Sequence, residues 1–244
     1  MKLIAITPCL DEERYITTLL ADLAKQTREP DLVLIADAGS TDNSLQIIKN
    51  FRLSLNIKVI KGGIPAFGRN QGGRLAPKGS LLFFLDSDVS LEPDFFEKVV
   101  AEMKARGLES GTCANIPFYR SWEKGANSWW IRVFDLWFYW WHNSFLHITT
   151  WFHYPVATGT FIASTKSGFD KINGYNEEIG FAEDSDFSNR VSKVCKWGVL
   201  KSVRVLVSTR RFDSKGRLWF PIKVGVYALL FRVFNLGKNW KYFD

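Results

Sequence analysis

The sequence predicts an α/β fold in which a mostly parallel β-sheet carries helices on both faces. Short β-branched or aromatic runs alternate with amphipathic helical patterns, and the strand–helix unit recurs four times within about the first 106 residues. Acidic residues gather where several of these strands end. Strands connected through helices pair in parallel, so their carboxyl ends share one edge of the sheet, where ligands of such folds bind.

Four apolar runs are predicted as strands, at residues 3–7, 32–36, 57–60 and 81–85. Helical periodicity is found over residues 14–25, 43–51 and 93–106. In the first of these segments Leu19, Leu20 and Leu23 fall on one face. A face of this kind is typical of a helix that packs on a sheet.

Length and composition favour one large domain, or one domain with an extension, among the 244 residues. A hydrophobic content of 46% and a charged content of 23% exclude disordered, collagen-like and low-complexity chains. The net charge of +7, with 10 Trp and 20 Phe, indicates an anionic partner. Composition leaves open whether that partner is a nucleic acid, a nucleotide or an anionic membrane surface.

The cysteines and the N-terminus favour a cytoplasmic protein. Cys9, Cys113 and Cys195 are odd in number and far apart, without the spacing of a zinc or thiol-redox site. We therefore expect free thiols and a reducing compartment. Only four apolar residues precede Thr7 and Pro8, which is too few for the apolar region of a signal peptide.

The run LLFFL ends in Asp86-Ser87-Asp88. Two carboxylates so close at a strand end repel each other unless a cation neutralises them, and a hard divalent ion bridged to a substrate diphosphate commonly does so. Asp11, Asp37 and Asp42 also follow strands. Each of them could have a role in the site at this sheet edge, or it could be a helix N-cap or a first-turn acid with a structural role only.

Four motifs in the N-terminal half resemble those of the family 2 glycosyltransferases, in the same order and at similar spacing. They are P-C-L-D-E-E from Pro8, D-A-G-S-T-D from Asp37, A-F-G-R-N-Q-G from Ala66, and F-F-L-D-S-D ending at Asp88. Asp11 and Ala38 depart from the Asn and Asp that are usual in the family. The resemblance implies a GT-A fold, which is Rossmann-like.

The second half extends the resemblance, which covers roughly residues 3–212. Residues 157–162 are similar to the family's strand of small residues that lines the acceptor site, and 169–175 to its turn after that strand. Residues 182–187, A-E-D-S-D-F, match the segment that supplies the general base. Glu183 and Asp184 can also be first-turn acids of a helix predicted over 184–196, and both roles are compatible.

The resemblance implies an inverting transfer of a hexose from a nucleoside diphosphate sugar to a hydroxyl or phosphate of an acceptor. Asp184 would be the base, supported by Glu183, and Asp88 with Asp86 would hold Mn²⁺ or Mg²⁺. Asp37 and the main chain near Pro8 would hold the base of the nucleotide, and Arg69 the ribose or diphosphate. The expected donor site comprises Thr7, Pro8, Glu12, Asp37, Arg69, Asp86, Arg210 and Arg211.

Arg210 and Arg211 follow a strand predicted over residues 202–208. They resemble the phosphate-contacting segment of small members of the family, in which a loop such as 213–217 closes over the donor. A solvated turn is the alternative.

Seven of the ten tryptophans lie between residues 122 and 151. The segment of about 126–150 is interrupted by Arg132 and Asp135 and again by residues 142–144, so it is a poor membrane-spanning helix. A helix that lies in the membrane interface is favoured. The alternative is a core helix that shields the acceptor cleft.

Residues 218–243 repeat this aromatic and cationic character and are too short to span a membrane alone. We expect a glycosyltransferase domain over 1–212, with a nucleotide-binding half (1–106) and an acceptor half (107–212). Residues 213–244 would form amphipathic helices on an anionic leaflet. The protein would then be peripheral on the inner face of the membrane, with a glycan or lipid-linked acceptor such as a polyprenyl phosphate.

Two other classes of protein share parts of this pattern. A nucleotidyltransferase would need a glycine-rich loop with Arg and Lys after the first strand, where this chain has Pro8-Cys9-Leu10-Asp11-Glu12. A nucleic-acid binder would use the positive charge and the aromatic residues. It would give no reason for acids at three strand ends, so we expect no nucleic-acid partner.

Overall fold

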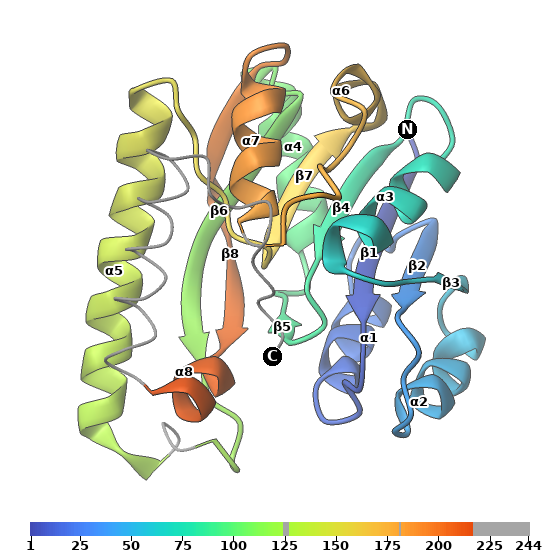
Figure 1. The fold of residues 1–244 in the computed structure, drawn as a ribbon, viewed down its shortest axis with the longest axis vertical. Helices are drawn as coiled ribbons and strands as arrows, with labels where there is room; N and C mark the ends of the chain where they lie inside the picture. Colours follow the sequence, from blue (N-terminus) through green and yellow to red (C-terminus); the bar gives the residue numbers. More distant parts are fainter. Residues whose placement is uncertain (124–126, 181, 217–244) are drawn as a thin grey trace.

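The computed structural model describes residues 1–123, 127–180 and 182–216, and it confirms the predicted α/β fold (Figure 1). Its sheet has eight strands within these residues, in the order β3-β2-β1-β4-β7-β6-β8-β5. The parallel N-terminal part consists of β1 (Leu3–Cys9), β2 (Leu32–Asp37), β3 (Ile57–Lys61) and β4 (Leu81–Leu85).

The second half of the sheet mixes both strand directions. β7 (Phe161–Thr165) is antiparallel to β4 and to β6 (Ser110–Phe118), whereas β8 (Trp197–Ser208) is parallel to β6. The short β5 (Val89–Ser90) pairs with β8 in the antiparallel sense. This arrangement lets the chain leave the end of β4 and return beside it, so the loop before β7 reaches the carboxyl edge of β4.

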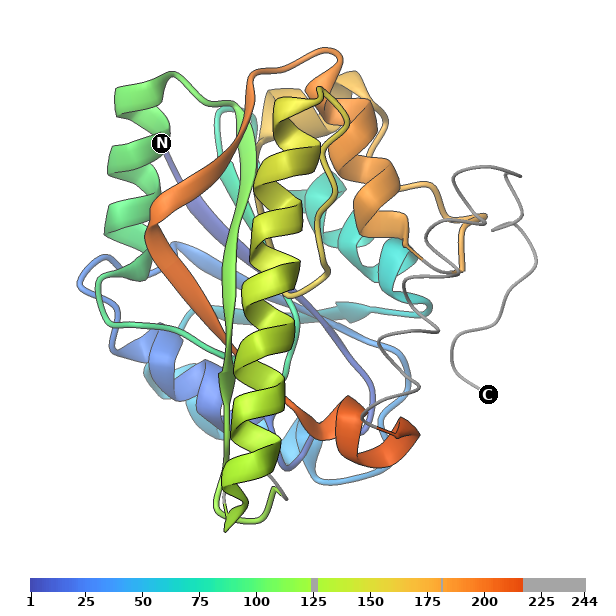
Figure 2. The same cartoon turned by 90° about the vertical axis from the view of Figure 1, so that its left-hand side faces the viewer.

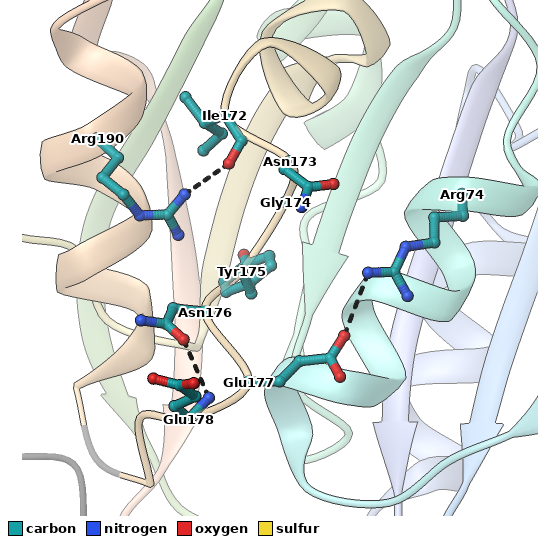
Figure 3. Close-up of a pocket in the computed structure, with 9 residues that line it drawn as sticks. All are labelled: Arg74, Ile172, Asn173, Gly174, Tyr175, Asn176, Glu177, Glu178 and Arg190. Atoms are coloured by element: carbon teal, nitrogen blue, oxygen red, sulfur yellow. Dashed lines mark hydrogen bonds and ion pairs between the residues drawn. The ribbon is translucent and has the colours of Figure 1, made fainter.

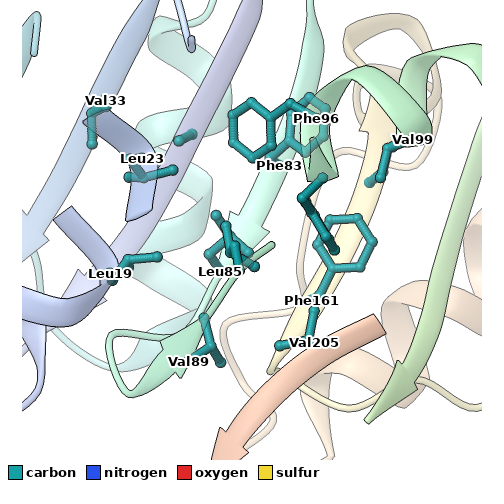
Figure 4. Close-up of a cluster of buried hydrophobic side chains, with 14 of the residues drawn as sticks. Leu19, Leu23, Val33, Phe83, Leu85, Val89, Phe96, Val99, Phe161 and Val205 are labelled. Carbon is teal, nitrogen blue, oxygen red and sulfur yellow. The ribbon is translucent and has the colours of Figure 1, made fainter. Parts of the chain in front are cut away.

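Helices cover both faces of the sheet. One face packs against α1 (Ile16–Ala24), α2 (Ser44–Asn50) and α4 (Phe95–Arg106), and η1 (Phe51–Leu53) follows α2. Buried aromatic rings join the layers there, with Phe83 stacked on Phe96 at 4.2 Å between ring centroids (Figure 4). Each such ring, when fully buried, contributes about 1.5–3 kcal/mol.

The opposite face of the sheet packs against α3 (Pro65–Leu75), α6 (Lys166–Lys171) and α7 (Glu183–Ser192). α3 corresponds to the glycine-rich motif and was not predicted as a helix. A Cβ on Gly72 would lie 2.5 Å from Ile6 Cγ2, and one on Gly73 would lie 2.4 Å from Phe169 Cζ. Each glycine costs about 1 kcal/mol of helix propensity, but it lets α3 approach the sheet closely. This approach brings Arg69 to the sheet edge.

The aromatic segment forms one helix, α5 (Trp129–Trp151), which runs beside β6 and β8 (Figure 2). Within the described residues, no helix is both long enough and apolar enough to cross a membrane.

Several predicted boundaries change in the C-terminal half. The strand predicted over 202–208 is β8, which begins already at Trp197, and the helix predicted over 184–196 is α7, which ends at Ser192. The strand expected at 157–162 begins only at Phe161, and part of the loop expected at 213–217 belongs to α8 (Arg210–Lys215). Phe212 anchors α8, because its ring packs on Phe138 of α5 with 5.1 Å between centroids. The helices predicted within 218–243 lie outside the described residues.

Candidate active site

Arg69 of α3 lies among three carboxylates that come from distant parts of the chain. Its Nη2 is 2.8 Å from Asp86 Oδ1, and its Nη1 is 2.8 Å from Glu183 Oε1 and 3.1 Å from Asp184 Oδ1. Arg69 is only 2% exposed. A buried guanidinium without partners would cost several kcal/mol, so these carboxylates stabilise its position. We call Arg69, Asp86, Glu183 and Asp184 the Arg69 cluster.

The loop before β7 closes the Arg69 cluster at Gly159. The carbonyl of Gly159 accepts a hydrogen bond from Arg69 Nη2 at 3.3 Å. A Cβ at this position would lie 2.7 Å from that nitrogen and 2.8 Å from Asp184 Oδ2. Any side chain here would therefore displace the cluster.

The proton affinity of Asp184 follows from its surroundings. Asp184 is 7% exposed, and burial raises its pKa well above the ordinary value. The charge of Arg69 lowers this pKa, whereas Glu183 and Asp86 raise it. Asp184 also lies in the first turn of α7, where the helix dipole favours a negative charge. The first-turn role expected from the sequence is therefore confirmed, and it is compatible with a role as a base.

A second arginine fastens α8 to the loops after β1 and β4. Arg210 donates from Nε to Asp88 Oδ2 at 2.9 Å and from both Nη atoms to the carboxylate of Glu12 at 2.7 and 2.6 Å. Its guanidinium carbon is 4.2 Å from the centre of the Tyr15 ring. Burial opposes its charge, but Asp88 and Glu12 raise the pKa of Arg210. We call Arg210, Asp88, Glu12 and Tyr15 the Arg210 cluster. The side chain of Arg211 lies outside the described part of the structure.

The two acids after β4 are divided between these clusters. Asp86 pairs with Arg69, and Asp88 pairs with Arg210. Two arginines therefore neutralise these carboxylates in this structure, and the sequence did not show that their side chains approach this strand end.

The residues after β4 fit a metal ion that arrives with a diphosphate. Among the described residues, no group of three or more His, Cys, Asp or Glu side chains could hold an ion. Asp88 offers hard carboxylate oxygens, and one of them, Oδ2, accepts a hydrogen bond from Arg210 Nε. Mg²⁺ in phosphate-transfer sites binds one or two carboxylates and completes its shell with phosphate and water oxygens. Asp88, with Asp86 beside it, matches that donor set.

Asp11 and Asp42 act as loop-forming acids. Asp11, at φ 52°, accepts from the Thr41 amide at 2.7 Å and thus joins the loops after β1 and β2. Asp42 accepts from the amides of Glu13 and Ser44, both at 2.9 Å. Burial opposes ionisation, but these hydrogen bonds lower the pKa of Asp42. Neither acid is a helix N-cap or a first-turn acid, because the N-cap residues of α1 and α2 are Tyr15 and Asn43 and the first turns of these two helices contain no acid. The N-cap or first-turn role considered from the sequence is therefore wrong for Asp11 and Asp42.

The expected nucleotide edge lies at the ends of β1 and β2. Asp37 accepts from the Ser40 hydroxyl at 2.6 Å and from the Gly39 amide at 3.1 Å, and it remains half-buried. Pro8 is half-buried and pairs in register with Ala36, the residue before Asp37. Thr7 is fully buried within β1, and among the described residues its hydroxyl has no hydrogen-bond partner.

A hydrogen-bond relay connects α5 to the loop that carries Gly159. Asn143 of α5 exchanges two hydrogen bonds, at 2.9 and 2.8 Å, with the main chain of Asn115 in β6. The side chain of Asn115 in turn bonds the hydroxyls of Thr158 and Thr160 at 3.0 and 2.9 Å. The inner side of α5 therefore helps to fix the loop that closes the Arg69 cluster.

A cavity of about 420 Å³ lies between α3 and α7, beyond Tyr175 (Figure 3). Arg74 and Glu177 face each other across it at 3.3 Å, and Arg190 donates to the Ile172 carbonyl at 2.9 Å. None of its lining residues belongs to the Arg69 or Arg210 cluster. Tyr175 links the cavity to the site, because its ring centre is 5.4 Å from the guanidinium carbon of Arg69.

The structure thus separates the predicted site residues into three groups: the Arg69 cluster, the Arg210 cluster, and the edge formed by Thr7, Pro8 and Asp37. The guanidinium of Arg69 faces carboxylates, in place of the ribose or diphosphate expected from the sequence. Sequence reasoning did not single out Gly159, Tyr15 or the Asn115–Asn143 pair. Gly159 lies in the segment of small residues at 157–162, and this resemblance indicated that its loop belongs to the site. No pattern in the sequence pointed to Tyr15 or to the Asn115–Asn143 pair.

Comparisons with known proteins agree with this arrangement. The model of the family described as "Glycosyl transferase family 2" matches residues 4–172. The poly(ribitol-phosphate) beta-N-acetylglucosaminyltransferase TarS of Staphylococcus aureus is 39% identical over 94 residues, which are 36% of this chain and 16% of TarS. Validoxylamine A glucosyltransferase of Streptomyces hygroscopicus is 32% identical over 102 residues, 39% of this chain and 22% of that protein. The matched region is thus under a quarter of either relative.

Solved structures share the fold. TarS 1–349 of S. aureus in complex with UDP superposes with a TM-score of 0.62 at 22% identity, covering 94% of this chain and 66% of that one. The mannosyltransferase PcManGT from Pyrobaculum calidifontis, in complex with GDP-Man and Mn²⁺, gives 0.65 at 16% identity, covering 84% and 56%. These likenesses establish the GT-A-like fold. Because the family model matches most of the sequence, the chain belongs to glycosyltransferase family 2.

Proposed function

We propose that this protein transfers a sugar from a nucleoside diphosphate sugar to an acceptor hydroxyl or phosphate by a single inverting displacement. The observation that carries the proposal is Asp184, a buried carboxylate held by Arg69 at 3.1 Å and bordered by Gly159. Its raised pKa suits a general base, which must take a proton near neutral pH.

In the proposed step the acceptor oxygen forms a bond to the anomeric carbon while the bond from that carbon to the diphosphate oxygen breaks. The acceptor proton passes to Asp184, and the nucleoside diphosphate leaves with the bonding electron pair. Glu183 supports the base by sharing Arg69 with it. Arg69 acts as a positioning residue, because its Nη atoms hold the carboxylates in place.

We infer that the Arg210 cluster receives the diphosphate. Arg210, with Arg211 beside it in sequence, would exchange Asp88 and Glu12 for phosphate oxygens, which frees both carboxylates. A Mn²⁺ or Mg²⁺ ion held by Asp88 and Asp86 would neutralise the charge of the leaving group. Asp37 and the main chain near Thr7 and Pro8 would hold the nucleotide base. The complexes of TarS with UDP-GlcNAc and of PcManGT with GDP-Man support a nucleotide-sugar donor.

We further propose that residues 1–106 bind the donor and that residues 107–212 bind the acceptor. The acceptor would be a glycan or a lipid-linked molecule at the inner face of a membrane, with the protein cytoplasmic and peripheral. The aromatic helix α5 in the acceptor half supports this location, as do the cations of the segment 213–244.

A thermal-shift panel of UDP- and GDP-sugars, each with Mn²⁺, Mg²⁺ or EDTA, tests the donor class. A ligand at a hundred times its Kd stabilises the fold by about 2.7 kcal/mol, which raises Tm by about 5 °C or more for a domain of this size. We expect such a shift with at least one sugar nucleotide and release of nucleoside diphosphate when acceptor is added. Pyrophosphate release from a nucleoside triphosphate would favour a nucleotidyltransferase. DNA retention without sugar-nucleotide binding would favour a nucleic-acid binder.

A further inference from the structure

One side of α5 is covered with large apolar side chains. Its large apolar side chains that are at least half exposed are Trp129, Trp130, Val133, Leu136, Trp137, Trp140, Trp141, Ile148 and Trp151, which we call the α5 outward face. At about 100° per residue they fall within an arc of about 140°. The buried residues Asp135, Tyr139, Leu146 and Thr149 fall on the opposite side.

This distribution differs from that of an ordinary surface helix, whose apolar stripe faces the core. α5 lies at the side of the sheet, against β6 and β8 (Figures 1 and 2). Because its buried residues lie on the other side of the helix, the outward face is turned toward solvent. Trp130, Trp140 and Trp151 are 69%, 67% and 80% exposed. Apolar surface gathered in this way marks a contact with another molecule or with a membrane.

We infer that the α5 outward face lies in the headgroup region of an anionic lipid bilayer. Tryptophan suits this depth, because its ring is apolar and its N–H can remain hydrated. The helix lies on the membrane and does not cross it, since no described helix is long and apolar enough to span.

The charges of α5 match an anionic surface. Its only acid, Asp135, is fully buried and accepts a hydrogen bond from the Tyr119 hydroxyl at 3.0 Å. Arg132 is exposed at the flank of the outward face. No carboxylate of α5 itself would therefore repel anionic headgroups.

The sequence after α8 is rich in cations. Phe212 of α8 packs on Tyr139 of α5 with 6.0 Å between ring centroids, so the chain leaves the described structure near this helix. Residues 217–244 contain five cations, Arg217, Lys223, Arg232, Lys238 and Lys241, against one acid, Asp244. Each cation close to an anionic leaflet strengthens attraction to it.

The inner side of the same helix leads to the Arg69 cluster through Asn143, Asn115 and the loop at Gly159. If the proposed function holds, membrane contact through α5 brings the acceptor loop next to lipid-linked substrates. The membrane contact itself involves neither the sugar nucleotide nor the acceptor, so it can be tested without any substrate.

The test is co-sedimentation of the full chain with phosphatidylcholine vesicles that contain no phosphatidylglycerol or about 30% phosphatidylglycerol. We expect binding to the anionic vesicles with a blue shift of Trp fluorescence. Salt should weaken binding without abolishing it, because screening removes the charge contribution and leaves the apolar one. The triple variant Trp137→Ser, Trp140→Ser, Trp141→Ser should lower the partition coefficient at least tenfold. The matched control Leu45→Ser, Leu53→Ser, Val194→Ser changes three exposed apolar residues elsewhere and should change it less than twofold.

Nucleotide-sugar thermal shifts on the triple variant show whether it is folded, so loss of vesicle binding by a folded variant supports the inference. Three results would overturn it: wild-type protein that stays in the supernatant with both vesicles, equal binding by the triple and control variants, or a solution dimer that the tryptophan substitutions dissociate. The last result would assign the face to a second copy of the chain. Wild-type protein that binds vesicles but no sugar nucleotide would refute the proposed function and leave the membrane surface standing.

Discussion

Arg69 Nη1 and Asp184 Oδ1 form a buried ion pair at 3.1 Å, and the same guanidinium also holds Asp86 and Glu183. One guanidinium therefore forms ion pairs with three carboxylates. Burial raises the pKa of Asp184, and the shared charge of Arg69 lowers it. The arrangement links the glycine-rich helix α3 to the base on α7, although the two lie more than a hundred positions apart in the sequence.

Replacing Arg69 with Lys should impair catalysis more than donor binding. Lysine keeps the charge but loses the planar fork that reaches several carboxylates at once, so the pKa of Asp184 should rise further. We expect kcat to fall by about 10- to 100-fold and the acid limb of the pH–rate profile to move to higher pH. The control Arg74→Lys, on the exposed side of the same helix, should leave the profile in place. An unchanged acid limb in Arg69→Lys would show that Arg69 does not set the proton affinity of the base.

Removal of the carboxylate of Asp88 should abolish metal-dependent donor binding. If Asp88 holds the metal ion as proposed, Asp88→Ala would remove a carboxylate ligand of that ion, so calorimetry should show at least a tenfold weaker affinity for the nucleoside diphosphate in Mn²⁺ or Mg²⁺. EDTA should weaken wild-type binding to a similar extent. The control Asp94→Ala removes an exposed acid of the same charge and should have little effect. Wild-type affinity that is unchanged in EDTA would exclude a metal from donor binding.

Gly159→Ala should disable the site without unfolding the domain. The added Cβ would lie 2.7 Å from Arg69 Nη2 and 2.8 Å from Asp184 Oδ2, so the Arg69 cluster must shift. We expect turnover to drop by at least tenfold while Tm falls by only a few degrees. At the control position, Gly63, a Cβ would meet only the edge of the Phe67 ring at 3.2 Å, and Gly63→Ala should retain most activity. Full turnover by Gly159→Ala would mean that the cluster tolerates displacement.

Glu102 provides a test of stability against pH. Burial opposes its ionisation, but hydrogen bonds from Ser202 and Lys201 lower the pKa of Glu102 from 4.5 to about 2. Because the folded pKa lies below the unfolded one, the carboxylate stabilises the fold above pH 4.5, and this contribution is lost as pH falls from about 5 to 2. Glu102→Gln should therefore lower the free energy of unfolding at pH 7 by about 1–3 kcal/mol.

Urea denaturation at a series of pH values checks this prediction. The difference in the free energy of unfolding between wild type and Glu102→Gln should shrink steadily below pH 5. Glu29→Gln, a substitution of the same type at an exposed position, should show a small difference at every pH. A difference for Glu102→Gln that does not depend on pH would mean that its carboxylate has an ordinary pKa in the folded protein.

The alternation of strands and helices was predictable because burial in a parallel sheet leaves continuous apolar runs such as LLFFL. The helix α3 was not predictable in the same way, since Gly68, Gly72 and Gly73 are poor helix formers. Their value lies in contacts with β-strands and with Phe169, which depend on the tertiary structure. Local propensity was overridden there by close packing.

The motifs located Asp86, Asp88, Glu183 and Asp184, but they did not show which cations approach these acids. Arg69 reaches Glu183, and Arg210 reaches Asp88, across more than 100 positions of sequence, so no local pattern records these pairs. Asp86 is only 17 positions from Arg69, but the two residues belong to separate elements whose approach depends on the tertiary structure. For α5, the sequence left open a membrane-facing or a core helix. The structure shows one buried side and one exposed, tryptophan-rich side. Periodicity in the sequence could indicate that α5 has two different sides, but not which side faces the sheet.

The most direct test of the proposed mechanism is single-turnover transfer by Asp184→Asn, measured beside Glu183→Gln and with donor affinity determined separately. The asparagine is nearly isosteric but cannot accept the acceptor proton. The rate of the chemical step should therefore fall by about 10²- to 10⁴-fold while the donor Kd changes less than threefold. Glu183→Gln should lose less. Retention of most single-turnover activity by Asp184→Asn would contradict the assignment of Asp184 as the base.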